Sequence, residues 1–168
     1  MIKKYRSDPL RYYFLREIPS TADGDFSERR FKELYNADLA NGLGNLIARV
    51  AKLAENNKVF LEDSSEPPHI SYSSIRGGYE NHLINYEFSL ALEEVWRDIK
   101  TIDNQLEHDK PWSLSQDVVA PMIKGYVREI KNIAFELQPF LPDTAGKILK
   151  QFAGPTIKSG PSLFPRLT

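Results

Sequence analysis

The chain has 168 residues, 41% of them hydrophobic, and its 22 basic and 23 acidic residues leave a formal net charge of −1. This length and composition describe one folded domain, with or without an arm, and exclude a chain that is disordered throughout. The near-zero charge argues against a protein that holds nucleic acid mainly by neutralising phosphates, but it allows one that reads a few exposed bases.

The absence of Cys excludes disulfides and thiolate metal sites. No apolar run has the length of a membrane span, and residues 1–10 carry no secretion signal. We therefore expect a cytoplasmic protein without a membrane partner.

The first third of the chain predicts two short helices. Apolar residues at helical spacing indicate a helix over residues 8–18, with Asp8 as its N-cap. Turn-forming residues follow, and Asp25 with Glu28 fits a capping box for a second helix over about 26–35.

A longer helix is predicted over about 37–55, because its apolar residues recur with a period of 3.6. Gly42 and Gly44 lower its intrinsic stability and indicate a close helix–helix contact. The apolar stripe consists of Leu39, Leu43, Leu46, Ile47, Val50, Leu53 and Ala54.

The rest of the chain predicts three more helices and an extended tail. Residues 56–79 read as a loop or partly ordered excursion, and helices follow over about 80–108, 117–138 and 142–153. The Gly- and Pro-rich tail is expected to be extended. Without any convincing strand pattern, the fold class is all-α, an antiparallel helix bundle.

Two features carry the candidate site, and the first is the polar face of the 37–55 helix. Asn41, Asn45, Arg49 and Lys52 gather there, and an Asn and an Arg at i and i+4 point the same way. Amides and guanidinium groups can read the edges of bases. The alternative is an ordinary solvated helix face.

The second feature is the pair Pro111–Trp112, which follows the 80–108 helix. Pro111 prevents the helix from continuing, and the flat Trp112 ring suits stacking on an unpaired base. The alternative is a Trp that packs into the end of the bundle. Together the two features favour a helical module that stacks and reads unpaired nucleotides.

No catalytic residue, metal site or cofactor site is predicted. His69, His82 and His108 share no ligand spacing, and the carboxylates of the 80–108 helix read as a solvated face. Phosphate-loop, nucleophile-elbow and zinc patterns are absent from the sequence.

From about residue 3 to 167 the chain resembles the methionyl-tRNA synthetase family. The resemblance rests on LRYYFLREIP…DGDFSERRFKELYNADLANGLGNLIAR, ALEEVWRDI…HDKPWSL, LQPFLPDTAGKIL and SLFPRL, in that order. Related synthetases for Leu, Ile and Val share the helical bundle, but DGDFS, the NADLANGLGNL helix and the PW pair are not expected there together.

The resemblance implies the C-terminal anticodon-binding bundle of such a synthetase. In the family the Asn and Arg of the NLxxR helix face the anticodon of methionine tRNA, which corresponds here to Asn45 and Arg49. The aromatic that stacks on an anticodon base corresponds to Trp112, preceded by Pro111. The implied organisation is the end of a linking segment over 1–25, the bundle over 26–155 and a tail over 156–168.

The resemblance also implies partners that these residues do not supply. In the family a catalytic domain binds ATP and performs tRNA aminoacylation, so we expect it in cis or in trans and expect no ligation by this chain alone. The opening segment is expected to expose Leu10, Tyr13 and Phe14 for that domain. Asp103 and Gln105 replace an Asn and an aromatic of the family, and an acidic Asp103 would weaken RNA binding.

Three hypotheses for the function stay open on these grounds. The first is an anticodon-binding module of methionyl-tRNA synthetase, favoured by the joint presence of Asn45, Arg49 and Trp112. The second is a helical interaction protein that keeps the fold without binding RNA. The third is the corresponding bundle of a Leu, Ile or Val synthetase.

Overall fold

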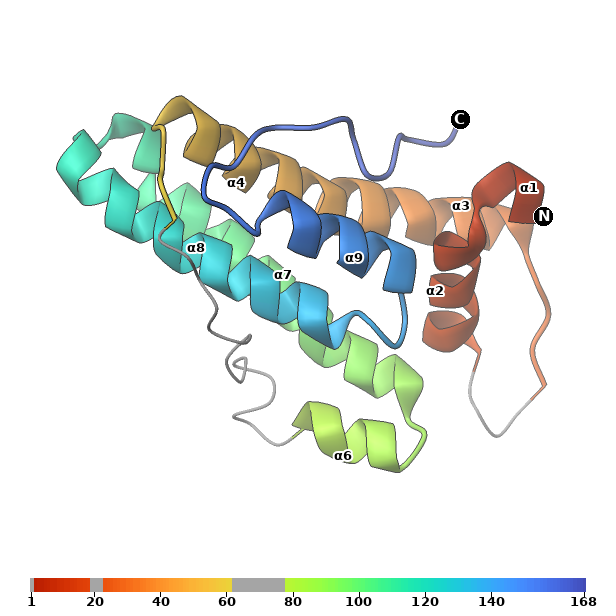
Figure 1. The fold of residues 1–168 in the computed structure, drawn as a ribbon. Coiled ribbons are helices and arrows are strands. Elements are labelled where there is room, and N and C mark those ends of the chain that lie inside the picture. Colours follow the sequence, from red (N-terminus) through yellow and green to blue (C-terminus); the bar gives the residue numbers. More distant parts are fainter. Residues whose placement is uncertain (1, 19–22, 62–77) are drawn as a thin grey trace.

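The computed structural model describes residues 2–18, 23–61 and 78–168, and these form helices that pack as a bundle (Figure 1). The pairing of strand-like backbone in these ranges is limited to one isolated bridge between Phe60 and Thr156. The predicted all-α class is therefore confirmed. Among the same residues, no helix has both the length and the apolar character needed to cross a membrane.

The described helices follow one another along the chain in this order. Their bounds are α1 Ile2–Tyr5, α2 Ser7–Glu17, α3 Glu28–Leu34, α4 Asn45–Asn56, α6 Gly78–Ile84, α7 Phe88–Asp109, α8 Gln116–Glu136 and α9 Pro142–Gln151. A π-helix, Tyr35–Gly44, lies between α3 and α4, and a 3-10 helix, Pro111–Ser113, lies between α7 and α8.

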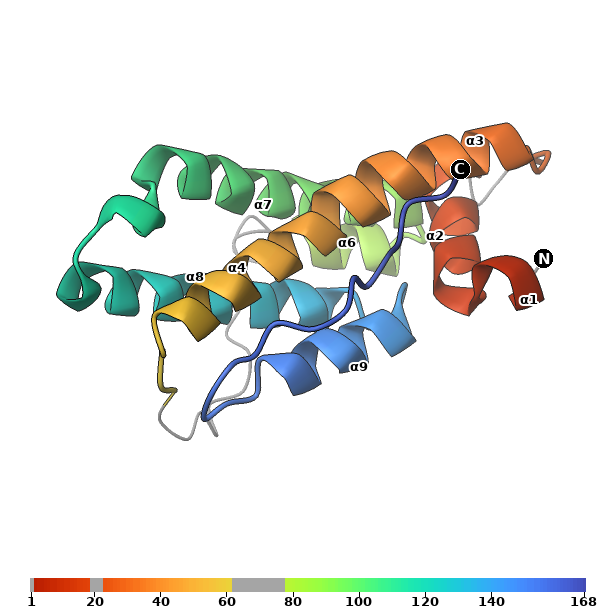
Figure 2. The ribbon, with the colours of Figure 1, turned by 90° about the horizontal axis from the view of Figure 1, so that it is seen from above.

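The predicted break between residues 35 and 37 is wrong, because α3, the π-helix and α4 form one continuous rod (Figure 2). The backbone stays right-handed helical at both junctions, and the wide turn lets the Asn45 N–H reach the Ala40 carbonyl five residues back. A Cβ on Gly44 would lie 2.9 Å from the Leu39 carbonyl oxygen of the same rod.

The predicted single helix over 80–108 is also wrong, since α6 and α7 are separated at residues 85–87. Tyr86 has φ 59°, in the left-handed region, which ends α6. The side chains of His82 and Glu87 meet across this turn at 2.7 Å. Residues 62–77, which hold His69 and most of the predicted 56–79 loop, lie outside the described part of the chain.

Two predicted helix caps are replaced by others. The Ser27 hydroxyl, rather than an Asp25–Glu28 box, accepts the Arg30 N–H of α3 at 3.3 Å. Asp8 lies inside α2 and accepts the N–H of Thr144 at 2.7 Å, so this buried carboxylate caps α9. Asp8 thereby fastens the first long helix to the last.

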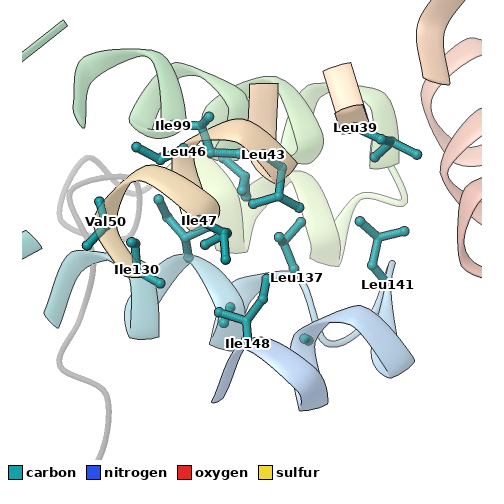
Figure 3. Packing of buried hydrophobic residues seen from close by; sticks show 14 of the residues in the cluster. Leu39, Leu43, Leu46, Ile47, Val50, Ile99, Ile130, Leu137, Leu141 and Ile148 are labelled. Atoms are coloured by element: carbon teal, nitrogen blue, oxygen red, sulfur yellow. The ribbon is translucent and has the colours of Figure 1, made fainter. Parts of the chain in front are cut away.

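The core forms where the apolar stripe of the π-helix and α4 meets α7, α8 and α9 (Figure 3). All of the predicted stripe is buried except Leu53, which is half-buried, so the periodicity identified this face correctly. The residues that surround the stripe in Figure 3 are Ile99, Ile130, Leu137, Leu141 and Ile148.

The opening helix α2 packs against the bundle, and the expectation that it exposes three apolar residues is mostly wrong. Leu10 and Tyr13 are buried, whereas Phe14 is 44% exposed. The Tyr13 ring packs edge-on against Phe26 and Phe31, so aromatic partners within this chain bury it.

The C-terminal tail returns along α4 and the π-helix to reach α3 (Figure 2). The Asn36 side chain holds its end, because the amide donates to the Leu167 carbonyl and accepts the Leu167 N–H, both at 2.9 Å. Phe164 is buried and lies 3.6 Å from where a Cβ on Gly44 would sit. The close helix–helix contact predicted at Gly44 is therefore wrong there, because the segment that approaches Gly44 is the tail.

Candidate functional site

The turn after α7 presents an aromatic ring to solvent. Lys110 adopts a left-handed conformation with φ 44°, and Pro111 is buried as the 3-10 helix begins. Trp112 follows and is 55% exposed. The alternative in which Trp112 packs into the bundle end is therefore not what the structure shows.

Hydrogen bonds hold this turn in place. The Lys110 carbonyl accepts the Ser113 N–H at 2.9 Å and its hydroxyl at 2.8 Å. The Tyr126 hydroxyl of α8 donates to Asp109 at 2.6 Å, and burial together with this bond raises the pKa of Tyr126. These bonds fix the turn and so position Trp112, and none of them involves the Trp112 ring, whose faces stay available for contact.

Arg49 reaches from α4 to the last turns of α7. Its Nη1 donates to Asp103 Oδ1 at 2.5 Å, and its Nη2 donates to Glu107 Oε1 at 2.5 Å. Arg49 and Asp103 each stood out in the sequence, but their pairing was not predicted. The i, i+4 spacing of Asp103 and Glu107, which puts both carboxylates on one face of α7, was the available signal.

Asn45 lies on the other side of α4, towards the tail. It is exposed and lines a groove of about 480 Å³ between α4 and the tail. The structure therefore places Asn45 and Arg49 on one helix but directs them to different neighbours. Asn41 and Arg166 also line this groove, and Arg166 has no ionic partner in the described part of the chain.

A second groove, of about 490 Å³, runs between the π-helix and α7. It shares Asp103 with the Arg49 cluster, and the Trp96 ring, which packs at 4.6 Å on Tyr12, lies in its wall. Sequence reasoning missed this groove because its walls come from separate segments. The lining residues are Arg16, Gly42, Glu93, Trp96, Arg97, Ile99, Lys100 and Asp103.

The two His residues that the structure describes do not converge on a site. His82 lies at the turn between α6 and α7 and contacts Glu87, whereas His108 lies near the end of α7 and contacts Asp109 at 3.0 Å. Within residues 2–18, 23–61 and 78–168, no group of three or more potential metal ligands comes together. Arg49 and Trp112 instead lie at the C-terminal end of α7, whereas Asn41 and Asn45 line the groove beside the tail.

Comparison with known proteins first identifies the class. Residues 1–51 match the family model described as tRNA synthetases class I (M). The apo form of methionyl-tRNA synthetase from Mycobacterium tuberculosis has a similar fold, with a TM-score of 0.82 at 24% identity over 99% of this chain and 40% of that chain. The helical bundle is thus one that occurs in class I tRNA synthetases.

Within that class, the relatives are methionine–tRNA ligases. Those of Clostridium acetobutylicum and Listeria monocytogenes are 30% and 31% identical over 99% of this chain and 30% of their own length. The Bacillus subtilis methionine–tRNA ligase is 32% identical over 90% of this chain and 25% of its length. These matches confirm the predicted resemblance to methionyl-tRNA synthetase, and the chain spans about 30% of the relatives' length.

Proposed function

We propose that this chain binds the anticodon loop of methionine tRNA, as one part of a methionine–tRNA ligase. The observation that carries the proposal is the exposed Trp112 ring on a bundle related to methionine–tRNA ligases along its whole length. Helical bundles bury Trp readily, so an exposed Trp fixed by a hydrogen-bonded turn is suited to a partner with a flat face. An unpaired base offers such a face.

Arg49 and Asn45, both on α4, supply base recognition in this proposal. Arg49 carries two Nη groups that suit a bidentate contact with a base edge, and Asn45 offers an exposed amide. In the unbound chain both Nη groups are occupied by Asp103 and Glu107. Base binding by Arg49 therefore exchanges at least one of these carboxylates for the base.

The overall charge suits a reader of bases better than a general binder of polyanions. With a formal net charge of −1, non-specific attraction to phosphates is small. We expect modest affinity for an isolated anticodon stem-loop and weak affinity for unrelated RNA. An equal affinity for both would favour a different role for the bundle.

The test compares two exposed aromatic residues. Trp112→Ala should weaken binding of a CAU anticodon stem-loop about tenfold, because stacking contributes roughly 1–3 kcal/mol per base. Phe135→Ala is the matched control, since Phe135 in α8 is 52% exposed and Trp112 is 55% exposed. Binding is followed by fluorescence anisotropy of a labelled stem-loop, and folding by thermal melts.

Equal affinities of the two variants would contradict the stacking role of Trp112. If the unaltered, folded chain failed to bind the stem-loop, the RNA-binding proposal would fail. A helical protein-interaction module would then be favoured.

Ligation itself is assigned to other parts of such a ligase. In this proposal ATP and methionine bind to a catalytic domain that acts with the bundle in cis or in trans. Methionine-dependent ATP–pyrophosphate exchange should accordingly be absent from the purified 168-residue chain. Exchange by the chain alone would contradict this assignment, and binding to a synthetase catalytic domain in a pull-down would support it.

A further inference from the structure

One face of α7 carries a row of charged residues whose sign changes along the helix. Arg97, Lys100, Asp103 and Glu107 are spaced three or four residues apart, so they lie on the same face. The row is about 15 Å long at the rise of an α-helix. Arg49 neutralises its acidic end by contacting both Asp103 and Glu107.

The basic end of the row lines the groove between the π-helix and α7. Among the groove's other charged residues, Arg16 pairs with Glu93 at 2.8 Å and Arg97 pairs with Glu94 at 2.6 Å. Lys100 is exposed and has no ionic partner in the part of the chain that the structure describes. The groove therefore contains a cation that no described residue pairs with.

The position of the groove favours an anionic polymer as its occupant. Asp103 lies both in the groove and against Arg49, so the groove continues directly from this proposed base-reading residue. A strand whose bases reach Arg49 has this groove directly beside it at Asp103, and its backbone carries one negative charge per nucleotide. Lys, a compact cation on a flexible stem, suits a phosphate oxygen.

We propose that this groove holds the sugar–phosphate backbone of the bound RNA strand and that Lys100 contacts one of its phosphates. The inference rests on the proposed function, because it assigns a path to the strand whose bases that function places at Arg49 and Trp112. Lys100 then contributes affinity without reading sequence, whereas Arg49 and Asn45 contribute discrimination.

The experiment measures the salt dependence of RNA binding by two lysine variants. Lys100→Ala should weaken binding of a CAU stem-loop about fivefold at 0.1 M salt and reduce the slope of log K against log salt by about 0.7, the contribution of one phosphate contact to a single strand. A scrambled-loop RNA should lose the same factor, so the affinity ratio of the two RNAs stays constant.

Lys150→Ala is the matched control. Lys150 is an exposed lysine of α9, outside the groove, and its loss changes the net charge of the chain equally. We expect the Lys150→Ala variant to bind the CAU stem-loop with the same affinity, and with the same slope of log K against log salt, as the unaltered chain. Because both lysines are exposed, circular dichroism and melting curves should be unchanged in both variants.

The outcomes separate this inference from the proposed function. If the unaltered chain binds the stem-loop and the two lysine variants behave alike, the backbone path is wrong while RNA binding stands. If Lys100→Ala changes the ratio of CAU to scrambled RNA instead of the slope, Lys100 reads a base, and the assignment of a phosphate contact is overturned. If the unaltered chain binds no RNA, the proposed function fails, and this inference fails with it.

Discussion

The guanidinium of Arg49 bridges Asp103 and Glu107, two carboxylates one turn apart on α7, with both Nη–O distances at 2.5 Å. The bridge joins α4 to α7 close to the turn that carries Trp112. Its side chains are a quarter to two-thirds exposed, and ion pairs at such sites contribute about 0–1 kcal/mol. An RNA base can therefore replace one carboxylate at small cost.

Replacement of Arg49 should change specificity more than stability. We expect Arg49→Ala to narrow the affinity gap between a CAU stem-loop and a scrambled loop, because a bidentate base contact contributes about 1–3 kcal/mol of discrimination. Parallel titrations of both RNAs measure the gap. If both affinities fell by one factor, Arg49 would be a phosphate contact rather than a base reader.

Asp103→Asn should tighten RNA binding. The change removes a negative charge from the side of α7 that we propose meets the RNA, and the neutral amide oxygen accepts from Arg49 Nη1 more weakly than the carboxylate does. We expect about threefold tighter binding at 0.1 M salt, an effect that fades at higher salt. Glu80→Gln, at an exposed position of α6, controls for net charge. Weaker binding by Asp103→Asn would show that the carboxylate orients Arg49 for the base.

Gly44→Ala should destabilise the fold, whereas Gly146→Ala should not. The new Cβ at position 44 would lie 2.9 Å from the Leu39 carbonyl oxygen, and we expect a loss of about 1–3 kcal/mol. Gly146 lies inside α9 with open space around its Cβ position, so Ala should stabilise there by about 0.4–1 kcal/mol. Chemical denaturation measures both values. Equal stabilities would mean that the rod relaxes around residue 44.

The bond between Tyr126 and Asp109 should make part of the stability depend on pH. Hydrogen bonds from His108 and Tyr126 lower the pKa of Asp109 in the fold. Because the pKa of Asp109 is lower in the folded state than in the unfolded state, where it is about 3.9, ionised Asp109 stabilises the fold at pH values above 3.9. This contribution to stability is lost as the pH falls through the pKa of Asp109 in the folded state. Tyr126→Phe should thus melt below the unaltered chain at pH 7, and the difference should shrink below pH 4. A difference that stays constant over this range would exclude the linkage.

The local pattern of the sequence predicted much of the fold, and the resemblance of its motifs indicated the family. The period of 3.6 identified the buried stripe of the π-helix and α4, including Leu43 and Val50, because periodicity depends on residues within a few turns of each other. The same locality explains the two wrong boundaries. At the first boundary, a π-helix continues the helical backbone through residue 36. At the second, the left-handed conformation of Tyr86 ends a helix although the apolar pattern of the sequence continues on both sides of this residue.

The sequence alone determined that the chain is helical, that it resembles methionyl-tRNA synthetase, and that Trp112 follows the end of a helix. Tertiary structure decided that Trp112 faces solvent, that Arg49 pairs with a residue 54 positions away, and that Tyr13 is buried among aromatic rings of this chain. The physical reason is that helix formation is decided by neighbours in the chain. Exposure and ion pairing depend on which distant segments pack beside a residue, and this packing cannot be predicted from the local pattern of a single sequence.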